Sequence, residues 1–285
     1  LQPAGLHVVF NPNAPEVQQA CDAFEITWAA QQQQLGTGHA VQQAMPGIPD
    51  EADVLVLYGD IPLLEAGVLE KLVETPSSGL KVLTMNIAEP KGYGRIVRDT
   101  NGSITGIVEE RDASETQRAI TEVNSGIIMA PRAALATCLE SMASENSQNE
   151  YYLTDVFSIA CGKGIETTGV LTPVAADLEG ANDRIQLAAL ERRYRMKMSR
   201  ELMLAGVQLA DPKRIDVRGK VVTGSDVYID VNVILEGDIS LGDGVEIGPG
   251  CVLKNCQLAA GTRVHAVHGA PKVGTGQDPH TGLHP

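Results

Sequence analysis

Residues 221–251 read VVTGSDVYIDVNVILEGDISLGDGVEIGPGC and carry the clearest pattern in the chain. Every sixth residue there is aliphatic or a cysteine, namely Val221, Val227, Val233, Ile239, Val245 and Cys251. A repeat of six residues is typical of a left-handed parallel β-helix, in which three hexads form one triangular coil around the repeated side chains. The repeat slips by one residue after Asn255-Cys256 and resumes at Leu258 and Val264, which predicts one longer corner. We therefore expect residues 211–266 to form the first coils of such a β-helix.

The stretch before the coils predicts one long helix from about Arg184 to Ala205. Apolar residues recur there at intervals of three and four, at Leu187, Leu190, Tyr194, Met198 and Leu202. Gly206 can then end the helix. We expect residues 184–210 to be a connector whose apolar stripe packs on the preceding domain, rather than a partner-binding or membrane-surface helix.

Residues 1–183 alternate short apolar runs with helical patterns, which is typical of an α/β domain. Strands are expected at 6–10, 54–58, 80–85, 104–108 and 125–129, and helices at 64–74 and 132–142. The run from Val54 to Tyr58 is apolar throughout, so we expect it to be buried on both faces of a mostly parallel sheet. The sequence thus predicts a three-layer domain.

Composition excludes several classes of protein. The 285 residues carry 22 Lys and Arg against 36 Asp and Glu, a net charge of −14 without a basic cluster, which argues against nucleic-acid binding. The longest apolar runs are far shorter than the roughly twenty residues of a membrane span. The 5 cysteines form neither CxxC pairs nor an even framework, so we expect reduced thiols in a cytoplasmic protein.

A glycine-rich stretch, QQQQLGTGH at 31–39, lies between an expected strand and an expected helix. Its bare backbone N–H groups can contact a base or a phosphate, and a Gln side chain can pair with an amide-like ring edge. The alternative is a turn that caps the helix running from His39 to Met45.

A second motif, Tyr58-Gly59-Asp60, follows the strand that we expect to be buried. Open α/β sheets bind ligands at this position, and a carboxylate there can hold Mg²⁺ against substrate phosphates. The alternative is that Asp60 caps a helix that starts near Pro62.

Three short polar clusters border strands: KGYGRI at 91–96, IVEE at 107–110 and EVNSG at 122–126. Their Glu and Asn side chains and glycyl amides suit sugar hydroxyls, although each cluster taken singly is more often a hairpin turn. A further cluster, EGAND at 179–183, can bring Asn182 to the same metal as Asp60 or can cap the long helix.

These motifs occur in a recognisable order: QLGTGHA, LYGDIP, GYGRIVR, IVEERDA, EVNSGI, NEYYLTD and LEGANDRIQL, followed by hexapeptide repeats. Over about residues 1–266 the chain resembles the bacterial bifunctional N-acetylglucosamine-1-phosphate uridylyltransferase / glucosamine-1-phosphate N-acetyltransferase family. The resemblance implies a Rossmann-like nucleotidyltransferase domain that joins UTP and N-acetylglucosamine 1-phosphate into UDP-N-acetylglucosamine and pyrophosphate with Mg²⁺. It also implies a β-helix acetyltransferase domain that uses acetyl-CoA and glucosamine 1-phosphate and assembles as a homotrimer. Such an enzyme supplies peptidoglycan and lipopolysaccharide precursors in the cytoplasm.

The same resemblance implies roles for individual residues. Contacts to the uracil and the nucleotide are implied for Gln31, Gly36 and Thr37. Binding of Mg²⁺ is implied for Asp60 and Asn182, with Tyr58 and Gly59 beside them. Contacts to the N-acetylglucosamine moiety are implied for Gly94, Glu109 and Asn124. In-line attack by the sugar phosphate then needs positioning and charge neutralisation but no general base, because a phosphate is already an anionic nucleophile.

The chain departs from the family at both ends. The family opens with a strand and a basic glycine-rich loop that cradles the triphosphate, followed by a lysine that faces the substrates, and no part of this chain matches them. Its acetyltransferase histidine lies in later coils, so His265 and His268 are not given that role. We therefore expect a chain truncated at both ends, with a partial uridylyltransferase domain at 1–183 and impaired turnover.

Residues 267–285 match no part of the family, and we expect them to be a disordered tail. Four of the 6 histidines lie at His265, His268, His280 and His284, a spacing that fits no strong metal template. A frameshift or a misassembled end is the alternative origin of this segment. Two other functions stay open: a different sugar-1-phosphate nucleotidyltransferase, such as a glucose-1-phosphate enzyme, and a non-catalytic remnant that only binds sugar nucleotides or trimerises.

Overall fold

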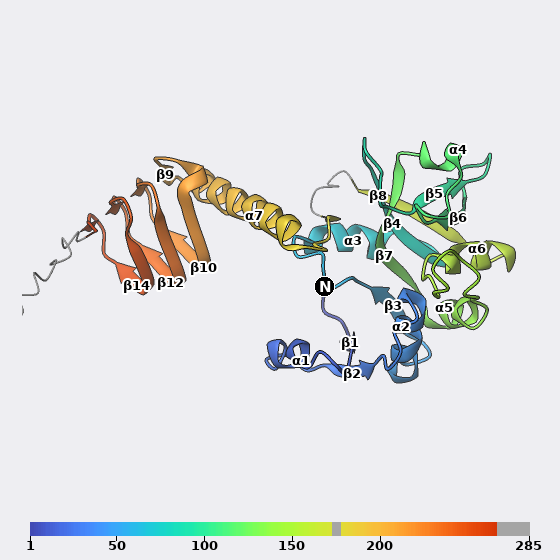
Figure 1. Cartoon of the computed structure of the whole chain (residues 1–285). Helices are drawn as coiled ribbons and strands as arrows, with labels where there is room; N and C mark the ends of the chain where they lie inside the picture. Colours follow the sequence, from blue (N-terminus) through green and yellow to red (C-terminus); the bar gives the residue numbers. More distant parts are fainter. Residues whose placement is uncertain (173–177, 267–285) are drawn as a thin grey trace, which may run out of the picture. The chain divides into compact units, whose positions relative to one another are not determined.

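The computed structural model describes residues 1–172 and 178–266. The chain divides into two units, Leu1–Gln186 and Leu187–Pro285, and each is described by itself (Figure 1). The boundary lies within the first turn of the long helix, close to the predicted boundary at residue 183. The predicted tail at 267–285 lies outside the described residues.

The first unit is an α/β domain with a mixed sheet. Its elements are β1 (His7–Phe10), α1 (Glu16–Ala20), β2 (Thr27–Ala30), α2 (Thr37–Ala44), β3 (Asp53–Val56), α3 (Ala66–Glu74), β4 (Leu80–Asn86), β5 (Arg95–Arg98), β6 (Ile104–Val108), α4 (Glu115–Arg118), β7 (Glu122–Pro131), α5 (Arg132–Leu139), α6 (Asp155–Gly162) and β8 (Thr167–Thr172). The main sheet has the order β6-β5-β7-β4-β8, and β3 pairs with β7 beside this path. A separate parallel pair, β1-β2, carries the first predicted strand.

Helices cover both faces of the main sheet, so the predicted three layers are confirmed. Successive residues of β4 point to opposite faces. Val82 packs in a core with residues of α2, α5 and α6. Leu83 packs in a second core with Leu69 and Leu72 of α3.

Two expectations about the sheet are wrong. All its pairings except β4-β8 are antiparallel: the long strand β7 runs opposite to its neighbours β3, β4 and β5, and β6 runs opposite to β5. The strand predicted at 54–58 is shorter and only partly buried, with Leu57 at 45 % exposure. Among the described residues β3 has a strand on one side only, whereas β4 lies between β7 and β8 and is buried from Leu80 to Met85. An apolar run therefore marked a strand but not its place in the sheet.

The second unit confirms the parallel coils. After α7 (Arg184–Leu204) come β9 (Gln208–Leu209), β10 (Ile215–Thr223), β11 (Tyr228–Ile229), β12 (Val233–Leu241), β13 (Glu246–Ile247), β14 (Val252–Leu258) and β15 (Arg263–Val264). The strands stack in parallel as β10-β12-β14 and β9-β11-β13-β15. Ile215 pairs with Val233 and Tyr228 with Glu246, each 18 residues on, so one coil takes three hexads.

The predicted hexad series fills the interior of the coils. Of its members, Val227, Val233, Ile239, Val245 and Cys251 are buried, and Val221 is half-buried. A second series two residues later is buried as well, at Ile229, Leu235, Leu241 and Ile247. Residues two apart on an extended segment share a face, so each side of the triangular coil supplies two interior side chains. The sequence reading identified only one of these series.

The predicted longer corner is instead one residue shorter. Glu236 pairs with Lys254, 18 residues on, but Ile239 pairs with Cys256, only 17 residues on. Asn255, with φ 44°, alone forms the corner that Gly237 and Asp238 form in the preceding coil. Its Oδ1 accepts a hydrogen bond from the Asp238 N–H at 3.0 Å. Leu258 therefore continues the second interior series rather than the first.

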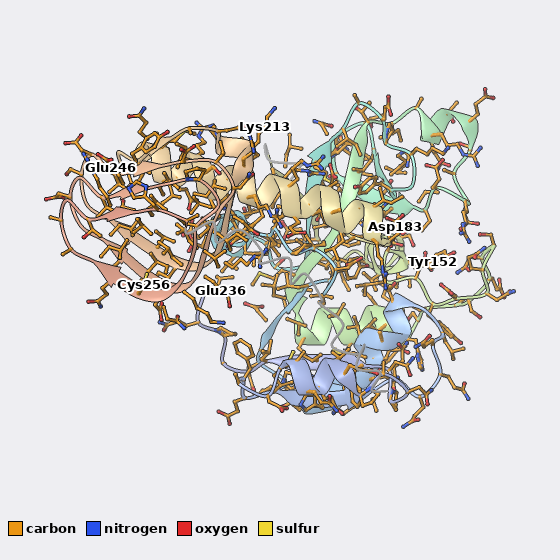
Figure 2. The ribbon with its side chains drawn as sticks, turned by 60° about the vertical axis from the view of Figure 1, so that its left-hand side comes forward. Tyr152, Asp183, Lys213, Glu236, Glu246 and Cys256 are labelled. Carbon is orange, nitrogen blue, oxygen red and sulfur yellow. The ribbon has the colours of Figure 1, made fainter. Side chains whose placement is uncertain are left out.

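Ion pairs join neighbouring coils on the outside. Glu236 and Glu246, labelled in Figure 2, pair with Lys254 at 2.6 Å and with Arg263 at 3.0 Å. These exposed pairs add little stability in water, so the buried interior dominates.

Helix α7 ends as predicted but packs differently. Gly206 has φ 97°, and the Val207 N–H bonds the Leu202 carbonyl at 3.0 Å, which closes the helix. Met198 and Leu202 pack into the core of the coils. Within the stripe predicted to pack on the preceding domain, Leu187 and Tyr194 are exposed. Along the described part of the chain, no helix combines the length and apolar character that a membrane span requires.

Candidate functional site

The glycine-rich stretch forms a tight loop at the start of α2. Gly36 is the residue before the helix, with φ 107°, a conformation that favours glycine. A Cβ at Gly36 would lie 2.6 Å from the Tyr151 carbonyl oxygen. The helix-capping alternative is therefore confirmed, and among the described contacts the Gly36 and Thr37 N–H groups donate no hydrogen bond.

Residues 150–155 hold this loop in place. The Tyr151 N–H donates to the Leu35 carbonyl at 2.8 Å, and the Gly38 N–H donates to the Tyr151 carbonyl at 2.8 Å. The Leu153 N–H donates to Thr37 Oγ1 at 3.1 Å. The sequence reading quoted NEYYLTD as a motif but gave it no role, because backbone hydrogen bonds leave little trace in side-chain types.

Tyr58 connects the loop to strand β7. Its hydroxyl lies beside the Thr37 side chain. Its ring lies against Gly126, where a Cβ would lie 2.2 Å from the Tyr58 Cε2 atom. Burial and then the nearby Glu109 carboxylate raise the pKa of Tyr58 to about 12, so the hydroxyl stays protonated at neutral pH. The two groups of residues assigned to the nucleotide and to the sugar thus meet at one side chain.

The three residues assigned to the sugar lie together. The Asn124 N–H donates to the Gly94 carbonyl at 2.9 Å, and a Cβ on Gly94 would lie 3.3 Å from a Glu109 carboxylate oxygen. Thr154 Oγ1 donates to Glu109 at 2.9 Å. Burial, and to a lesser degree Asp112, raises the pKa of Glu109. A desolvated carboxyl beside a bare glycine and an amide suits the recognition of sugar hydroxyl or amide groups.

Arg95, next to Gly94, is buried and holds the segment around Gly94 in place through an ion pair. It is 1 % exposed and pairs with Glu110 at 2.6 Å. The Arg95 guanidinium lowers the pKa of Glu110. The GYGR and VEE motifs therefore contain structural residues as well as the assigned ones.

A cleft of about 630 Å³ adjoins the Glu109 carboxyl along β6 and α6. Asp112, Tyr152 and Asp155 also line it. Burial, then Glu109 and Asp112, raises the pKa of Asp155 to about 6. This edge of the site is therefore strongly acidic.

The predicted metal ligands come from segments that lie side by side. The Ala181 N–H donates to the Asp60 carbonyl at 3.0 Å, and a Cβ on Gly180 would lie 3.0 Å from Asp60 Oδ2. Asn182 is exposed, as is Asp60. Within residues 1–172 and 178–266, no three His, Cys, Asp or Glu side chains gather as a metal site. A carboxylate and an amide still fit Mg²⁺, which keeps several waters and takes further oxygens from phosphates.

The two capping alternatives have opposite outcomes: the one for Asp60 is wrong, whereas the cluster at 179–183 does cap α7, through Asp183. Helix α3 begins at Ala66, well beyond Asp60. For α7, it is Asp183 Oδ1 that accepts from the Ile185 and Gln186 N–H groups, both at 2.8 Å. The Asp60 and Asn182 side chains therefore cap neither helix.

Comparison with known proteins agrees with both parts of the fold. Residues 1–100 match the MobA-like NTP transferase domain, and residues 220–255 match the bacterial transferase hexapeptide of six repeats. The chain is 46 % identical over 266 residues to the bifunctional protein GlmU of Alkalilimnicola ehrlichii, covering 93 % of this chain and 58 % of that protein. It is 50 % identical over 242 residues to GlmU of Acinetobacter baumannii, covering 85 % and 53 %.

The chain belongs to the GlmU family. It carries a nucleotidyltransferase domain followed by hexapeptide repeats. It is also 47 % identical to GlmU of Pseudomonas entomophila, again covering 93 % of this chain and 58 % of the relative. It thus spans between half and three fifths of the length of these GlmU proteins.

Proposed function

We propose that the first unit binds a uridine nucleotide and N-acetylglucosamine 1-phosphate and transfers a uridylyl group between them. One observation carries the proposal: Tyr58 lies beside Thr37 and packs on Gly126, which joins the nucleotide loop to the strand that carries Asn124. UTP and N-acetylglucosamine 1-phosphate are then the substrates, and UDP-N-acetylglucosamine and pyrophosphate the products.

The proposed site residues fall into a group that contacts the nucleotide and a group that contacts the sugar. Gln31, Gly36 and Thr37 contact the uracil and the nucleotide. Gly94, Glu109 and Asn124 hold the N-acetylglucosamine moiety, with Glu109 accepting a hydrogen bond from the sugar. Tyr58 and Gly59 lie between the two groups.

Asp60 and Asn182 hold Mg²⁺ beside Tyr58 and Gly59. When bound, the ion supplies positive charge to the phosphate oxygens at the point where the phosphoryl bond breaks. Asp60 is anchored for this role by its carbonyl bond to Ala181. The sugar phosphate attacks in line without a general base, so the chain contributes orientation and charge rather than a covalent step.

Calorimetric titration with UDP-N-acetylglucosamine and Mg²⁺, run beside a pyrophosphate-release assay with UTP and N-acetylglucosamine 1-phosphate, tests the proposal. We expect Asp60→Ala to remove uridylyl transfer. Asp22→Ala, which removes an exposed carboxylate outside the site motifs, should leave it unchanged. Binding without turnover would favour the non-catalytic remnant. A preference for glucose 1-phosphate would favour the other sugar-phosphate enzyme. Undiminished turnover by Asp60→Ala would contradict the metal assignment.

We extend the proposal to the remaining segments by family. Residues 1–183 form the uridylyltransferase part, 184–210 the connector and 211–266 the start of an acetyltransferase domain that forms homotrimers. Acetyl-CoA and glucosamine 1-phosphate are partners of the complete family enzyme. The setting is precursor synthesis for peptidoglycan and lipopolysaccharide in the cytoplasm.

A further inference from the structure

His39, in the first turn of α2, has no role in the proposal so far, yet it contacts the Gln31 side chain. Gln31 Nε2 lies 3.1 Å from the Gly36 carbonyl oxygen and 3.0 Å from His39 Nδ1. A backbone carbonyl can only accept, so the amide nitrogen of Gln31, not its oxygen, must face Gly36. This contact fixes which way round the Gln31 amide lies.

The orientation of Gln31 determines the state of His39. The second N–H of Gln31 points to His39 Nδ1, so Nδ1 accepts and the ring proton lies on Nε2. Two other side chains flank the ring: the Gln43 amide nitrogen lies 3.2 Å from Nε2, and the Tyr151 ring centroid lies 6.4 Å away. The Gln43 amide nitrogen also donates to the His39 carbonyl at 3.2 Å. A proton on Nε2 therefore requires the Gln43 amide to turn, to give up this bond within the helix and to accept from Nε2–H through its oxygen.

With both N–H groups of Gln31 engaged, only its oxygen is left for a ligand. Among the described contacts, Gln31 Oε1 accepts no hydrogen bond, and the N–H groups of Gly36 and Thr37 donate none. The loop therefore offers an acceptor close to backbone donors. An imide edge, an N–H beside a carbonyl, is complementary to this pattern.

We infer that His39 is a positioning residue that makes Gln31 present its oxygen to the base and so selects uracil over cytosine. This inference rests on the proposed binding of a uridine nucleotide. Uracil offers N3–H to Gln31 Oε1 and O4 to a loop N–H. Cytosine offers a lone pair at N3 and an amino group at C4, so it places like against like at both points. Without the acceptor at Nδ1, the Gln31 amide is held by one bond instead of two and can turn.

The first test needs no ligand. The ¹⁵N chemical shifts of the His39 ring, measured by long-range proton–nitrogen NMR on the full chain, report which ring nitrogen carries the proton. We expect an unprotonated Nδ1 at neutral pH, and a proton on Nδ1 would overturn the inference. Failure of nucleotide binding would count against the proposed function and would leave this measurement valid.

The second test compares nucleotides. In calorimetric titrations with UDP and with CDP, each with Mg²⁺, we expect His39→Phe to lower the ratio of the two affinities by about tenfold, the worth of roughly one hydrogen bond. Phe keeps the ring and removes the acceptor. His39→Asn restores an acceptor near Nδ1 and should recover most of the preference for UDP.

Gln42→Ala is the matched control, because it removes a 2.8 Å bond from α2 to the Leu139 carbonyl without touching Gln31. It should keep the preference for UDP. An unchanged ratio in His39→Phe, or equal losses in the Phe and Asn variants, would show that His39 serves only the packing of the helix.

Discussion

Gly126 is the position at which we expect an added methyl group to destabilise the candidate site most. It has φ 84°, and a Cβ there would lie 2.2 Å and 2.5 Å from two carbons of the Tyr58 ring. A non-glycine residue in this conformation costs about 1–2 kcal/mol, and forcing an extra group into a packed interior costs a further 1–3 or so. We therefore expect Gly126→Ala to lower the free energy of unfolding of the first unit by about 2–5 kcal/mol.

Gly102 is the matched control for this experiment. Its φ of 85° is nearly the same, but nothing lies within 4 Å of a Cβ placed there. Gly102→Ala should therefore show the backbone cost of about 1–2 kcal/mol alone. The difference between the two variants isolates the clash with the Tyr58 ring.

Urea unfolding followed by the fluorescence of Trp28, the 1 tryptophan of the chain, reports on the first unit. In a Tyr58→Ala background the additional cost of Gly126→Ala should disappear, since the atoms that clash are gone. Equal destabilisation by Gly126→Ala and Gly102→Ala would refute the reasoning. So would an additional cost that persists without the Tyr58 ring.

Two further predictions concern charge and the interior of the coils. Burial and the neighbouring carboxylates raise the pKa of Asp155 in the folded protein from 3.8 to about 6. In the unfolded chain Asp155 ionises near its ordinary pKa, so the free energy of unfolding falls as the pH rises from about 4 to 6. The free energy of unfolding of Asp155→Asn should therefore exceed that of the parent by about 1–2 kcal/mol above pH 6, and the two should be equal at pH 4. Thermal melts at the two pH values measure this, and a difference that does not depend on pH would contradict the prediction. In the coils, Leu235 is 0 % exposed and Val252 is 62 % exposed. We expect Leu235→Ala to lower the free energy of unfolding by about 2–5 kcal/mol and Val252→Ala to lower it by less than about 0.5 kcal/mol. Chemical unfolding followed by circular dichroism measures both values, and similar losses in the two variants would argue against the second interior series.

The sequence predicted the coils well because their geometry is local and repeated. The hexad series named one of the two interior series, from Val227 to Cys251, and Gly206 marked the end of α7. The reading failed where one residue decides the register. At Asn255 the corner is shorter by one residue. Leu258 lies one residue after the next position of the first interior series and one residue before that of the second, so the pattern alone does not distinguish a gained residue from a lost one until the pairing is known.

The candidate site was predicted residue by residue through a resemblance, and the structure brings most of those residues into contact. The sequence reading gave no role to the segment 150–155, which bonds to the loop at Leu35 and Gly38 through backbone atoms. It also missed His39, because a histidine at the start of a helix has no distinctive spacing. Contacts of these kinds join positions that are far apart in the chain or depend on side-chain orientation.

By itself the sequence determined the two kinds of architecture, an α/β domain and stacked six-residue coils, since both follow from the periodic burial of side chains along one segment. Only the tertiary structure decided which strand is central in the sheet and which motifs meet. Strand β3 pairs only with β7 among the described strands. Tyr58 reaches both Thr37 and Gly126 because this antiparallel pairing places the end of β3 next to the first half of β7. Hydrogen bonds between strands connect backbone atoms that every residue shares, so a pattern of side chains cannot specify the partner.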